Sequence, residues 1–292
     1  MNKINQNLIK IEKWVDVNSP IPDFDFTGEY LNFAIEIMKR GLYLLKAGIS
    51  LTPNANTANK RYTKNRAIIV GHMVRITKLY EGSLMHVSNH QQELVHIFSR
   101  LIFETAIRME YLITSKAKKE SFHSFILASY RPEKEMLQDI ENKDKQQVPN
   151  QEWIRSVILS WLKKDGITEK ELLDNTIWRV DDKDLQDLIN ALEIDTYYFY
   201  EIVTASHHLH GDWLDMGYYH LRQDGRYFTP DLSFTEPDPK TACSITRVCL
   251  DSLLKYLKWN KSDPKNKINP IVEKLLELNI LLDAAFDDSF DE

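Results

Sequence analysis

The sequence predicts an all-α protein, an elongated antiparallel helical bundle. Apolar residues recur every three to four positions in nearly every periodic segment, which is the spacing of an amphipathic helix. The chain has only nine glycines and ten prolines among its 292 residues, and no pattern of strands joined by glycine-rich turns is visible. A chain of this length can also bury a sizeable core. We therefore expect helices to supply nearly all of the regular structure.

The first half of the chain is expected to hold an N-terminal arm and the longest helices. Residues 1–26 should form the arm, because Pro20 and Pro22 follow a single weakly amphipathic turn. Ser88 and Gln91 fit a capping box, so we expect the longest helix to start there. The helices expected in this half span 27–48, 59–81, 89–118 and, interrupted near Pro132, about 122–136.

The second half is expected to hold shorter helices and one long loop. The polar stretch 141–151 is expected to be an exposed loop within a single helical domain, residues 27–292. Thr168 and Glu171 fit another capping box. Residues 222–239 contain three prolines and are expected to form a long ordered loop. The helices expected here span 151–164, a short run after Thr168, 184–192, 196–210, 213–221, 243–259 and 271–286.

Cysteine spacing and hydropathy point to a cytoplasmic protein. Cys243 and Cys249 are six residues apart on one expected helix, too far round and along it to bridge each other. We interpret them as core thiols in a reducing compartment. The first thirty residues hold no apolar run with a cleavage site, and no segment reaches the roughly eighteen uninterrupted apolar residues of a membrane span. No membrane partner is expected.

Charge is unevenly distributed in this acidic chain. Its net charge of −6 argues against indiscriminate nucleic-acid binding. Between Glu36 and Glu81 there is no acidic residue, and the cations that lie there, which we call the basic tract, are Lys39, Arg40, Lys46, Lys60, Arg61, Lys64, Arg66, Arg75 and Lys78. The C-terminus is acidic by contrast. The tract is either a solvated surface or a partner for polyanions or for the acidic tail.

Residues 197–221 are the most chemically dense stretch, with four of the nine histidines. Gly211 can take the positive φ that ends a helix, and Asp212 can cap the next helix. The resulting turn should present His207, His210, Asp212, Trp213 and Asp215 close together. We therefore expect any reactive or recognition site to lie here.

Metal-independent RNA cleavage needs a base that titrates near neutral pH and a cation that stabilises the phosphorane. We expect His210 to be the base, Arg100 or Arg66 the cation, and Glu104, one helical turn from Arg100, the group that orients it. The candidate binding residues are Ser206, His207, Trp213, Asp215, Arg66 and His72. The alternative is that Arg100 and Glu104 form a structural ion pair and that His210 caps the end of a helix.

Neither a cofactor nor a metal is part of the main expectation. The alternative is a single zinc or manganese ion at His207, His210 and Asp215. A di-metal site is a further alternative, since residues 93–96 and 120–123 both read Glu-x-x-His. That pattern arises about once by chance in a chain of this composition.

The sequence resembles a bacterial family of all-helical proteins classified as a domain of unknown function. An Arg and a Glu one turn apart are followed about a hundred residues later by Tyr, Ser and then His-Gly-x-Trp. The matching residues are Arg100, Glu104, Tyr111, Tyr200, Ser206, His210, Gly211, Trp213, His220 and Pro230. The resemblance runs from about Lys60 to Pro239. It implies a helical fold and brings no reaction with it.

The expected shape is also similar to the HEPN group of helical domains, many of which are metal-independent ribonucleases of toxin and phage-defence systems. Their arginine–histidine spacing is matched by Arg66 and His72, without the polar residue that usually follows the arginine. This similarity implies a bacterial defence or toxin-type protein that acts on RNA or another phosphate-bearing ligand. If it is an enzyme, it would be a metal-independent endoribonuclease.

The alternative function is a non-enzymatic helical module that binds a partner protein or a small ligand. The basic tract discriminates between the two hypotheses. If its residues open onto the same groove as His210, a phosphate ligand gains support; if they lie on opposite faces, the interaction module is favoured. A homodimer formed through the apolar last helix, residues 271–286, is a further expectation.

Overall fold

The computed structural model describes residues 3–51, 62–114, 120–142, 150–194, 205–263 and 267–289. Helices supply nearly all of its regular structure, so the predicted all-α class is confirmed. The chain divides into two compact units, of which one joins residues 1–110 to 194–292 and the other comprises residues 111–193. A single domain over 27–292 stays a prediction.

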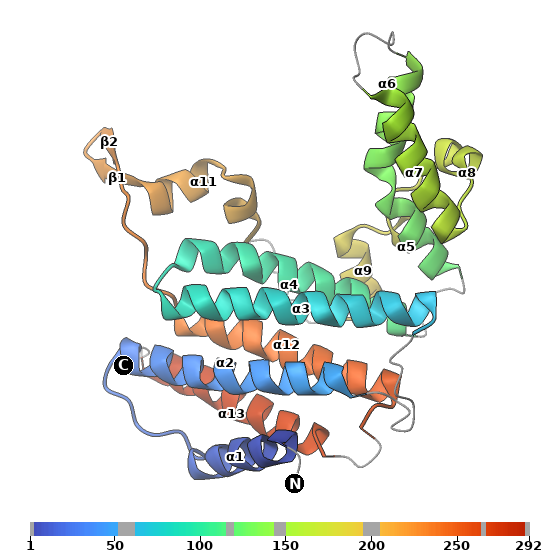
Figure 1. The fold of residues 1–292 in the computed structure, drawn as a ribbon. Helices are drawn as coiled ribbons and strands as arrows, with labels where there is room; N and C mark the ends of the chain where they lie inside the picture. The colour runs from blue at the N-terminus through green and yellow to red at the C-terminus, as the bar shows by residue number, and fades with distance from the viewer. Residues whose placement is uncertain are drawn as a thin grey trace. The chain divides into compact units, whose positions relative to one another are not determined.

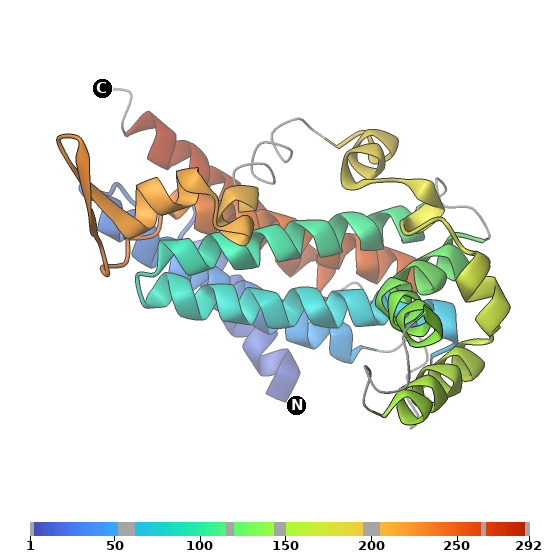
Figure 2. The ribbon, with the colours of Figure 1, turned by 90° about the horizontal axis from the view of Figure 1, so that it is seen from above.

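The larger unit is a bundle of long helices built around α12 (Figure 1). α12 packs against α13, α2 and α3, and side chains such as Ile37, Met73 and Leu250 are completely buried among them. Figures 1 and 2 both show α3 and α4 running side by side. The helices of this unit are α1 (Lys3–Val17), α2 (Thr27–Ser50), α3 (Lys64–Ser88), most of α4 (Gln92–Ile113), α12 (Pro239–Asn260) and α13 (Asn269–Asp288).

The segment expected to be an N-terminal arm contains a full helix, α1, of 15 residues. Val15 is buried, and α1 packs mainly against α13. On that side Lys274 of α13 lies 3.2 Å from the Glu12 carboxylate and 2.9 Å from that of Asp16. The predicted single turn is therefore too short, because apolar contacts with α13 stabilise a helix that its sequence alone makes only marginal.

The expected capping box at Ser88 is wrong. α3 continues through Ser88, and α4 begins only at Gln92. Val87 is completely buried, so the apolar side of α3 extends about two turns beyond the expected end at residue 81. His90 then takes a positive φ of 54°, and the Gln91 side chain accepts a hydrogen bond from the His86 ring at 2.7 Å instead of completing the box. A tight turn thus joins two long helices.

The smaller unit has its own apolar core of Tyr130, Leu137, Ile158, Leu162, Ile167 and Leu172. Its capping box at Thr168 and Glu171 and its helix end at Gly166, with φ 72°, are confirmed. Of the loop expected at 141–151, residues 143–149 lie outside the described residues. The helices are α5 (Ser121–Ser129), α6 (Arg131–Asn142), α7 (Gln151–Asp165), α8 (Glu169–Asp174), the short 3-10 helix η1 (Val180–Asp182) and α9 (Leu185–Leu192).

Asp181 ties the smaller unit together. Its carboxylate accepts hydrogen bonds from the Tyr111 hydroxyl at 2.7 Å and from the Ser121 hydroxyl. Tyr111 is completely buried, and its burial together with the neighbouring carboxylate raises the pKa of its hydroxyl. Tyr111, one of the residues that carry the family resemblance, therefore has a structural role here.

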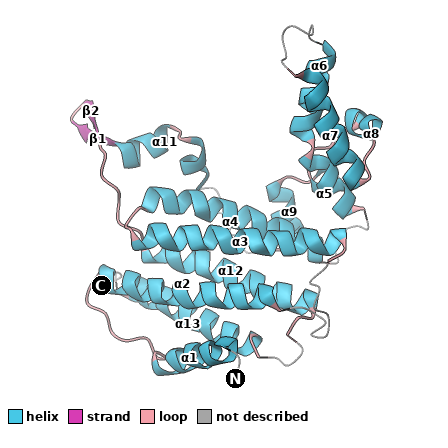
Figure 3. Cartoon of the chain, in the orientation of Figure 1, coloured by secondary structure: helices cyan, strands magenta, loops and turns pink. Residues whose placement is uncertain are grey.

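A β-hairpin occupies the start of the segment expected to be a loop at 222–239 (Figure 3). β1 (Leu221–Asp224) pairs antiparallel with β2 (Tyr227–Pro230). Gly225, with φ 59°, is the first of the two turn residues, Gly225 and Arg226, and glycine at this position is a known signal of a two-residue hairpin turn. The expectation failed because three prolines and mostly exposed strands hide the alternating pattern. Residues 231–238 do lack regular structure, as expected.

The cysteines agree with the sequence analysis. Cys243 and Cys249 are free thiols buried on α12, and burial raises the pKa of each thiol, which makes them poor nucleophiles. Among the described helices, none combines the length and the apolar character that crossing a membrane would require.

Replacing Gly82 by alanine tests the close packing of α3 on α4. A Cβ at Gly82 would lie 2.5 Å from Cε1 of the Phe98 ring, whereas a Cβ at Gly71 on the same helix meets no atom within 4 Å. Gly82→Ala should lower the free energy of unfolding by about 1–2 kcal/mol, because overpacking outweighs the gain in helix propensity. Gly71→Ala, the matched control, should raise it by up to about 1 kcal/mol. Urea denaturation measures both, and equal effects would contradict this packing.

Candidate functional site

A helix end, a glycine and a cap reverse the chain at residues 205–215. Residues 205–210 are helical, and the Gly211 N–H, at φ 59°, donates to the His207 carbonyl at 3.0 Å. The Asp212 side chain then caps α11 (Trp213–Asp215) by accepting from the N–H groups of Leu214 and Asp215. Both predictions about this turn, the positive φ and the cap, are confirmed. The reversal brings Asp215 back against the preceding helix.

Asp215 holds two histidines with its two carboxylate oxygens. His208 Nδ1 donates to Oδ1 at 2.7 Å, and His220 Nε2 lies 3.3 Å from Oδ2. The side chains of Asp215 and His208 are each only 6% exposed, whereas that of His220 is 45% exposed. His220 ends η2 (Met216–His220), a π-helical turn that leads into β1. One buried carboxylate therefore orients one buried imidazole and one that reaches solvent.

His96 of α4 completes this group, which we call the Asp215 cluster: His96, His208, Asp215, Tyr219 and His220. The rings of His96 and His208 stack with centroids 4.1 Å apart, and the Tyr219 ring meets that of His208 edge-on at 4.9 Å. Burial and the neighbouring His208 lower the pKa of His96 to about 4. His96 is thus neutral at neutral pH.

Gln92 fixes the tautomer of His96. The Gln92 amide Nε2 donates to His96 Nε2 at 2.8 Å and to the Thr241 hydroxyl at 3.2 Å, while its Oε1 accepts from the Asp238 N–H at 3.3 Å. His96 Nε2 must then be the unprotonated nitrogen, so the proton of the neutral ring is on Nδ1. The N-terminus of α12 is held by the same amide.

Glu93 anchors the segment that follows the hairpin. Its buried carboxylate accepts from the Thr235 N–H at 2.9 Å, and the Gln92 N–H donates to the Thr235 carbonyl at 3.1 Å. Burial and the Glu93 charge raise the pKa of the Tyr219 hydroxyl, which is therefore protonated at neutral pH. The first turn of α4 thus links the Asp215 cluster to residues 235–238.

A second histidine–carboxylate pair lies on the same turn. His207 Nδ1 and Asp212 Oδ2 are 2.5 Å apart, and both side chains are partly exposed. The hydrogen bond from His207 lowers the pKa of Asp212. The turn therefore presents two imidazoles, His207 and His220, each of which has one nitrogen on an aspartate and part of its surface in solvent.

The predicted catalytic residues are only partly brought together. Arg100 and Glu104 form an ion pair at 2.8 Å with side chains 15% and 20% exposed, and Glu104 also lies 3.3 Å from Arg108. His210 is exposed and makes no hydrogen bond, ion pair or ring contact with any described residue. A catalytic role for these three residues stays a prediction. Ser206 is partly buried one turn before His210.

The predicted Arg66–His72 pair is divided between different sides of α3, because positions six residues apart point about 120° away from each other around a helix. Arg66 donates to the Asn260 side chain at 2.9 Å and lies over the Trp259 ring at 5.4 Å. His72 Nδ1 donates to the Ile68 carbonyl at 2.8 Å, and burial lowers the pKa of its ring. Both side chains have structural partners.

The alternative metal sites are not assembled in the described parts of the chain. No group of three or more His, Cys, Asp or Glu side chains has a suitable arrangement there. His207 pairs with Asp212, whereas Asp215 pairs with His208 and His220, so the set His207, His210 and Asp215 does not converge. The histidine of the second Glu-x-x-His pattern, His123, also has another partner, because it pairs with Glu171 at 2.6 Å.

The glutamates that bound the basic tract neutralise part of it. Lys39 and Arg40 pair with Glu36 at 2.7 and 2.6 Å, and Lys46 pairs with Glu81 at 2.7 Å. Lys60, Arg61 and Tyr200 lie outside the described residues. In the acidic tail Asp287 pairs with Lys240, which is not in the tract.

The part of the tract on α2 does not share a groove with the histidine turn. Lys39, Arg40 and Lys46 lie on α2, which packs on α3, and α4 carries the His96 that stacks on His208. Figure 1 shows α3 and α4 between α2 and α11. Because these α2 cations and His210 do not open onto the same groove, they give no support to a phosphate site at His210.

Sequence reasoning did not single out His208. Leu209 and His210 are exposed, whereas Ala205 and the His208 side chain are buried one turn apart. A histidine counts as polar in a hydrophobic pattern, so its burial leaves no signal there. His96 was noticed only as part of a metal pattern. The adjacent pair His207 and His208 was the one local signal available.

A model of the family of unknown function DUF5677 matches residues 66–227, more than half of the chain, from the start of α3 to the hairpin. The matched range includes the whole Asp215 cluster and the Arg100–Glu104 pair. No curated protein and no solved structure matches the chain.

The low pKa of His96 makes the stability of the protein depend on pH. The folded-state pKa is about 4, below the value of about 6.5 in an unfolded chain. Between these values the unfolded state binds more protons, so stability falls as the pH drops through this window. From about pH 7 to about pH 5, His96 should account for a loss on the order of 1–2 kcal/mol.

Urea denaturation of the wild type and of His96→Gln at both pH values measures this loss. The wild type should lose more stability than the variant, since His208 and Asp215, the titratable neighbours, are present in both proteins. The same pH dependence in both would show that His96 is not held neutral by its surroundings.

Proposed function

We propose that this chain, which belongs to the family of unknown function DUF5677, cleaves RNA by acid–base catalysis with His220 as the general base. The observation that carries the proposal is the buried carboxylate of Asp215, which faces Nε2 of the half-exposed His220 ring. A carboxylate in that position favours the tautomer with its proton on Nε2 and leaves the lone pair of Nδ1 for a substrate.

RNA supplies a proton that such a base can remove. In the proposed step the 2′-oxygen attacks the adjacent phosphorus and its proton passes to His220 Nδ1. The bond from phosphorus to the 5′-oxygen breaks, and the leaving oxygen takes a proton from Nε2 of a protonated His207, whose Nδ1 faces Asp212. The products are a 2′,3′-cyclic phosphate and a free 5′-hydroxyl. Each histidine then has one role and one orienting aspartate.

Exposed aromatic side chains around His220 favour a single-stranded substrate. Tyr218 is 78% exposed, and Trp213 and Tyr227 are also largely exposed. The Arg226 guanidinium lies 5.2 Å from the centre of the Tyr227 ring. Aromatic and guanidinium faces stack on unpaired bases, which gives affinity without depending on a large positive charge. This surface supports RNA better than the basic tract does.

The wider setting that we propose is a bacterial defence or toxin-type protein with a HEPN-like core, which would act in the cytoplasm. The helical class and the sequence similarity support this setting. Cleavage would not use the Arg66–His72 motif, since Arg66 binds Asn260 and His72 binds Ile68. The proposed chemistry therefore rests on the Asp215 cluster and on the His207–Asp212 pair.

A cleavage assay on short single-stranded RNAs, with EDTA and with manganese, tests the proposal. Wild type should release products with 2′,3′-cyclic phosphates in EDTA. His220→Ala should slow this by at least about a hundredfold, because a general base is lost. Asp215→Asn should slow it less and change its pH profile, because the base remains but is no longer oriented.

His210→Ala is the matched control, since that histidine is exposed on the same turn and has no partner among the described residues. It should cleave at the wild-type rate. Added imidazole should partly restore His220→Ala, which a merely misfolded variant would not allow. Loss of activity in His210→Ala and Arg100→Ala, with His220→Ala fully active, would overturn the proposal in favour of the originally predicted residues.

A non-enzymatic binding module is the second candidate function. The ion pair of Arg100 with Glu104 and the separation of the basic tract from the histidine turn favour it. Wild-type protein that cleaves no RNA under any of these conditions would support this second candidate.

A further inference from the structure

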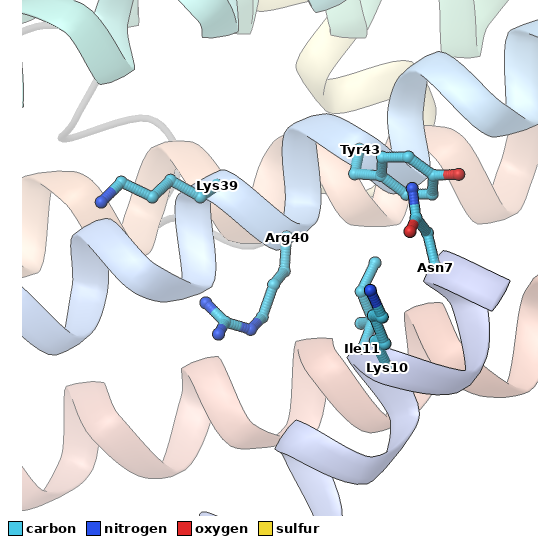
Figure 4. A pocket seen from close by; sticks show the side chains of 6 residues that line it. All are labelled: Asn7, Lys10, Ile11, Lys39, Arg40 and Tyr43. Atoms are coloured by element: carbon cyan, nitrogen blue, oxygen red, sulfur yellow. The ribbon is translucent and has the colours of Figure 1, made fainter. Parts of the chain in front are cut away.

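We propose a second site, which binds a small phosphate-bearing molecule in a pocket between α1 and α2 (Figure 4). It lies outside the residues that the family model matches and does not depend on the proposed ribonuclease activity. The cavity has a volume of about 250 Å³. Its lining residues are Asn7, Lys10, Ile11, Lys39, Arg40 and Tyr43.

Hydrogen-bond donors without acceptors converge on this cavity. Arg40 uses Nη1 for the Glu36 carbonyl and carboxylate, both at 2.6 Å, and its Nε and Nη2 have no acceptor among the described residues. Within the same ranges Lys10, Asn7 and Tyr43 make no side-chain hydrogen bond or ion pair. Figure 4 shows Asn7 and Lys10 on α1 facing Arg40 and Tyr43 on α2. The pocket therefore offers many donors to a ligand rich in acceptors.

The Arg40 guanidinium is held in place before any ligand binds. Its carbon lies 3.5 Å from the centre of the Trp14 ring on α1, and Glu36 fixes it from α2. A stacked, ion-paired guanidinium loses little side-chain entropy when it binds a ligand, and its planar donors match two oxygens of a phosphate. Arg40 is thus the expected anchor of the site.

The charge around the pocket is positive. Lys10, Lys39 and Arg40 contribute three cations, and Glu36 is the acidic partner that two of them share. The acidic residues of α1, Glu12 and Asp16, are paired with Lys274 of α13. Positions 7, 10, 11 and 14 follow helical spacing and line the α2 side of α1, so the basic and acidic faces of this helix are separate.

The size and the lining define the chemical class of the ligand. The cavity is slightly smaller than the roughly 300–1,000 Å³ of sites for drug-sized molecules. Arginine and lysine at one side suit a phosphate, while Tyr43 and the buried Ile11 provide aromatic and apolar surface for the group that carries it. Inorganic phosphate or a phosphomonoester such as a mononucleotide fits this description.

Isothermal titration calorimetry at constant ionic strength tests the site on the full chain, with inorganic phosphate, AMP and acetate as probes. Phosphate or AMP should bind, and acetate should bind far more weakly. Lys10→Gln and Arg40→Gln should each raise the Kd about tenfold, since each removes a charge-assisted contact. Lys46→Gln is the matched control, because Lys46 lies on α2 in the same basic tract but pairs with Glu81.

Each outcome decides the proposal. Tighter binding of AMP than of phosphate identifies a phosphomonoester as the ligand, and equal binding identifies the phosphate group alone; both support the site. No binding by wild type, or equal weakening by Lys46→Gln and Lys10→Gln, overturns it. Lys10 is exposed and has no partner among the described residues, so its substitution leaves the fold intact even if Arg40→Gln unfolds the protein. None of these readouts depends on RNA cleavage.

Discussion

The pairing of the buried Asp215 carboxylate with two histidines is the interaction on which the candidate site depends. A charge removed from water costs several kcal/mol unless hydrogen bonds and opposite charges compensate for it. Here His208 and His220 supply that compensation, one to each oxygen. Removing such a partner from a buried pair typically costs about 3–5 kcal/mol. The turn, the stacked His96 and the start of the hairpin are consequently coupled through a single side chain.

This arrangement separates buried histidines from histidines that reach solvent. His96 and His208 stack in the interior, and the low pKa of His96 keeps its ring neutral against that of His208. His207 and His220 each keep one nitrogen on an aspartate and part of their surface in solvent. Asp212 orients His207, and Asp215 orients His220. Both of these rings reach solvent, where a ligand can contact them. The Arg100–Glu104 ion pair stabilises α4 beside this group.

Local signals in the sequence were sufficient to predict helix starts and turns wherever a single residue type determines the backbone conformation. Gly211 and Asp212 predict the turn, and Thr168 with Glu171 predicts a helix start, because glycine geometry and side-chain caps act over three or four residues. The Ser88 cap failed because the buried Val87 extends α3 past it. Tertiary packing decided that boundary, and no local pattern reports it.

The site was harder to predict than the fold because its contacts are distant in sequence. The stacking of His96 on His208 joins α4 to a turn that follows more than a hundred residues later in the sequence. A buried polar residue also does not register in a hydrophobic pattern. At the turn that the sequence analysis singled out, Asp215 pairs with His208 and His220, whereas His210 is exposed. The hairpin escaped prediction for a related reason, since its strands are largely exposed.

The most direct test of this account is the protonation of the His208 and His220 rings, measured at neutral pH by long-range ¹H–¹⁵N correlation NMR. The account predicts a proton on Nδ1 of His208 and on Nε2 of His220, the nitrogens that face Asp215, and a loss of this preference in Asp215→Asn. An unprotonated Nδ1 in His208 of the wild type would contradict it, because Asp215 could not then organise the cluster.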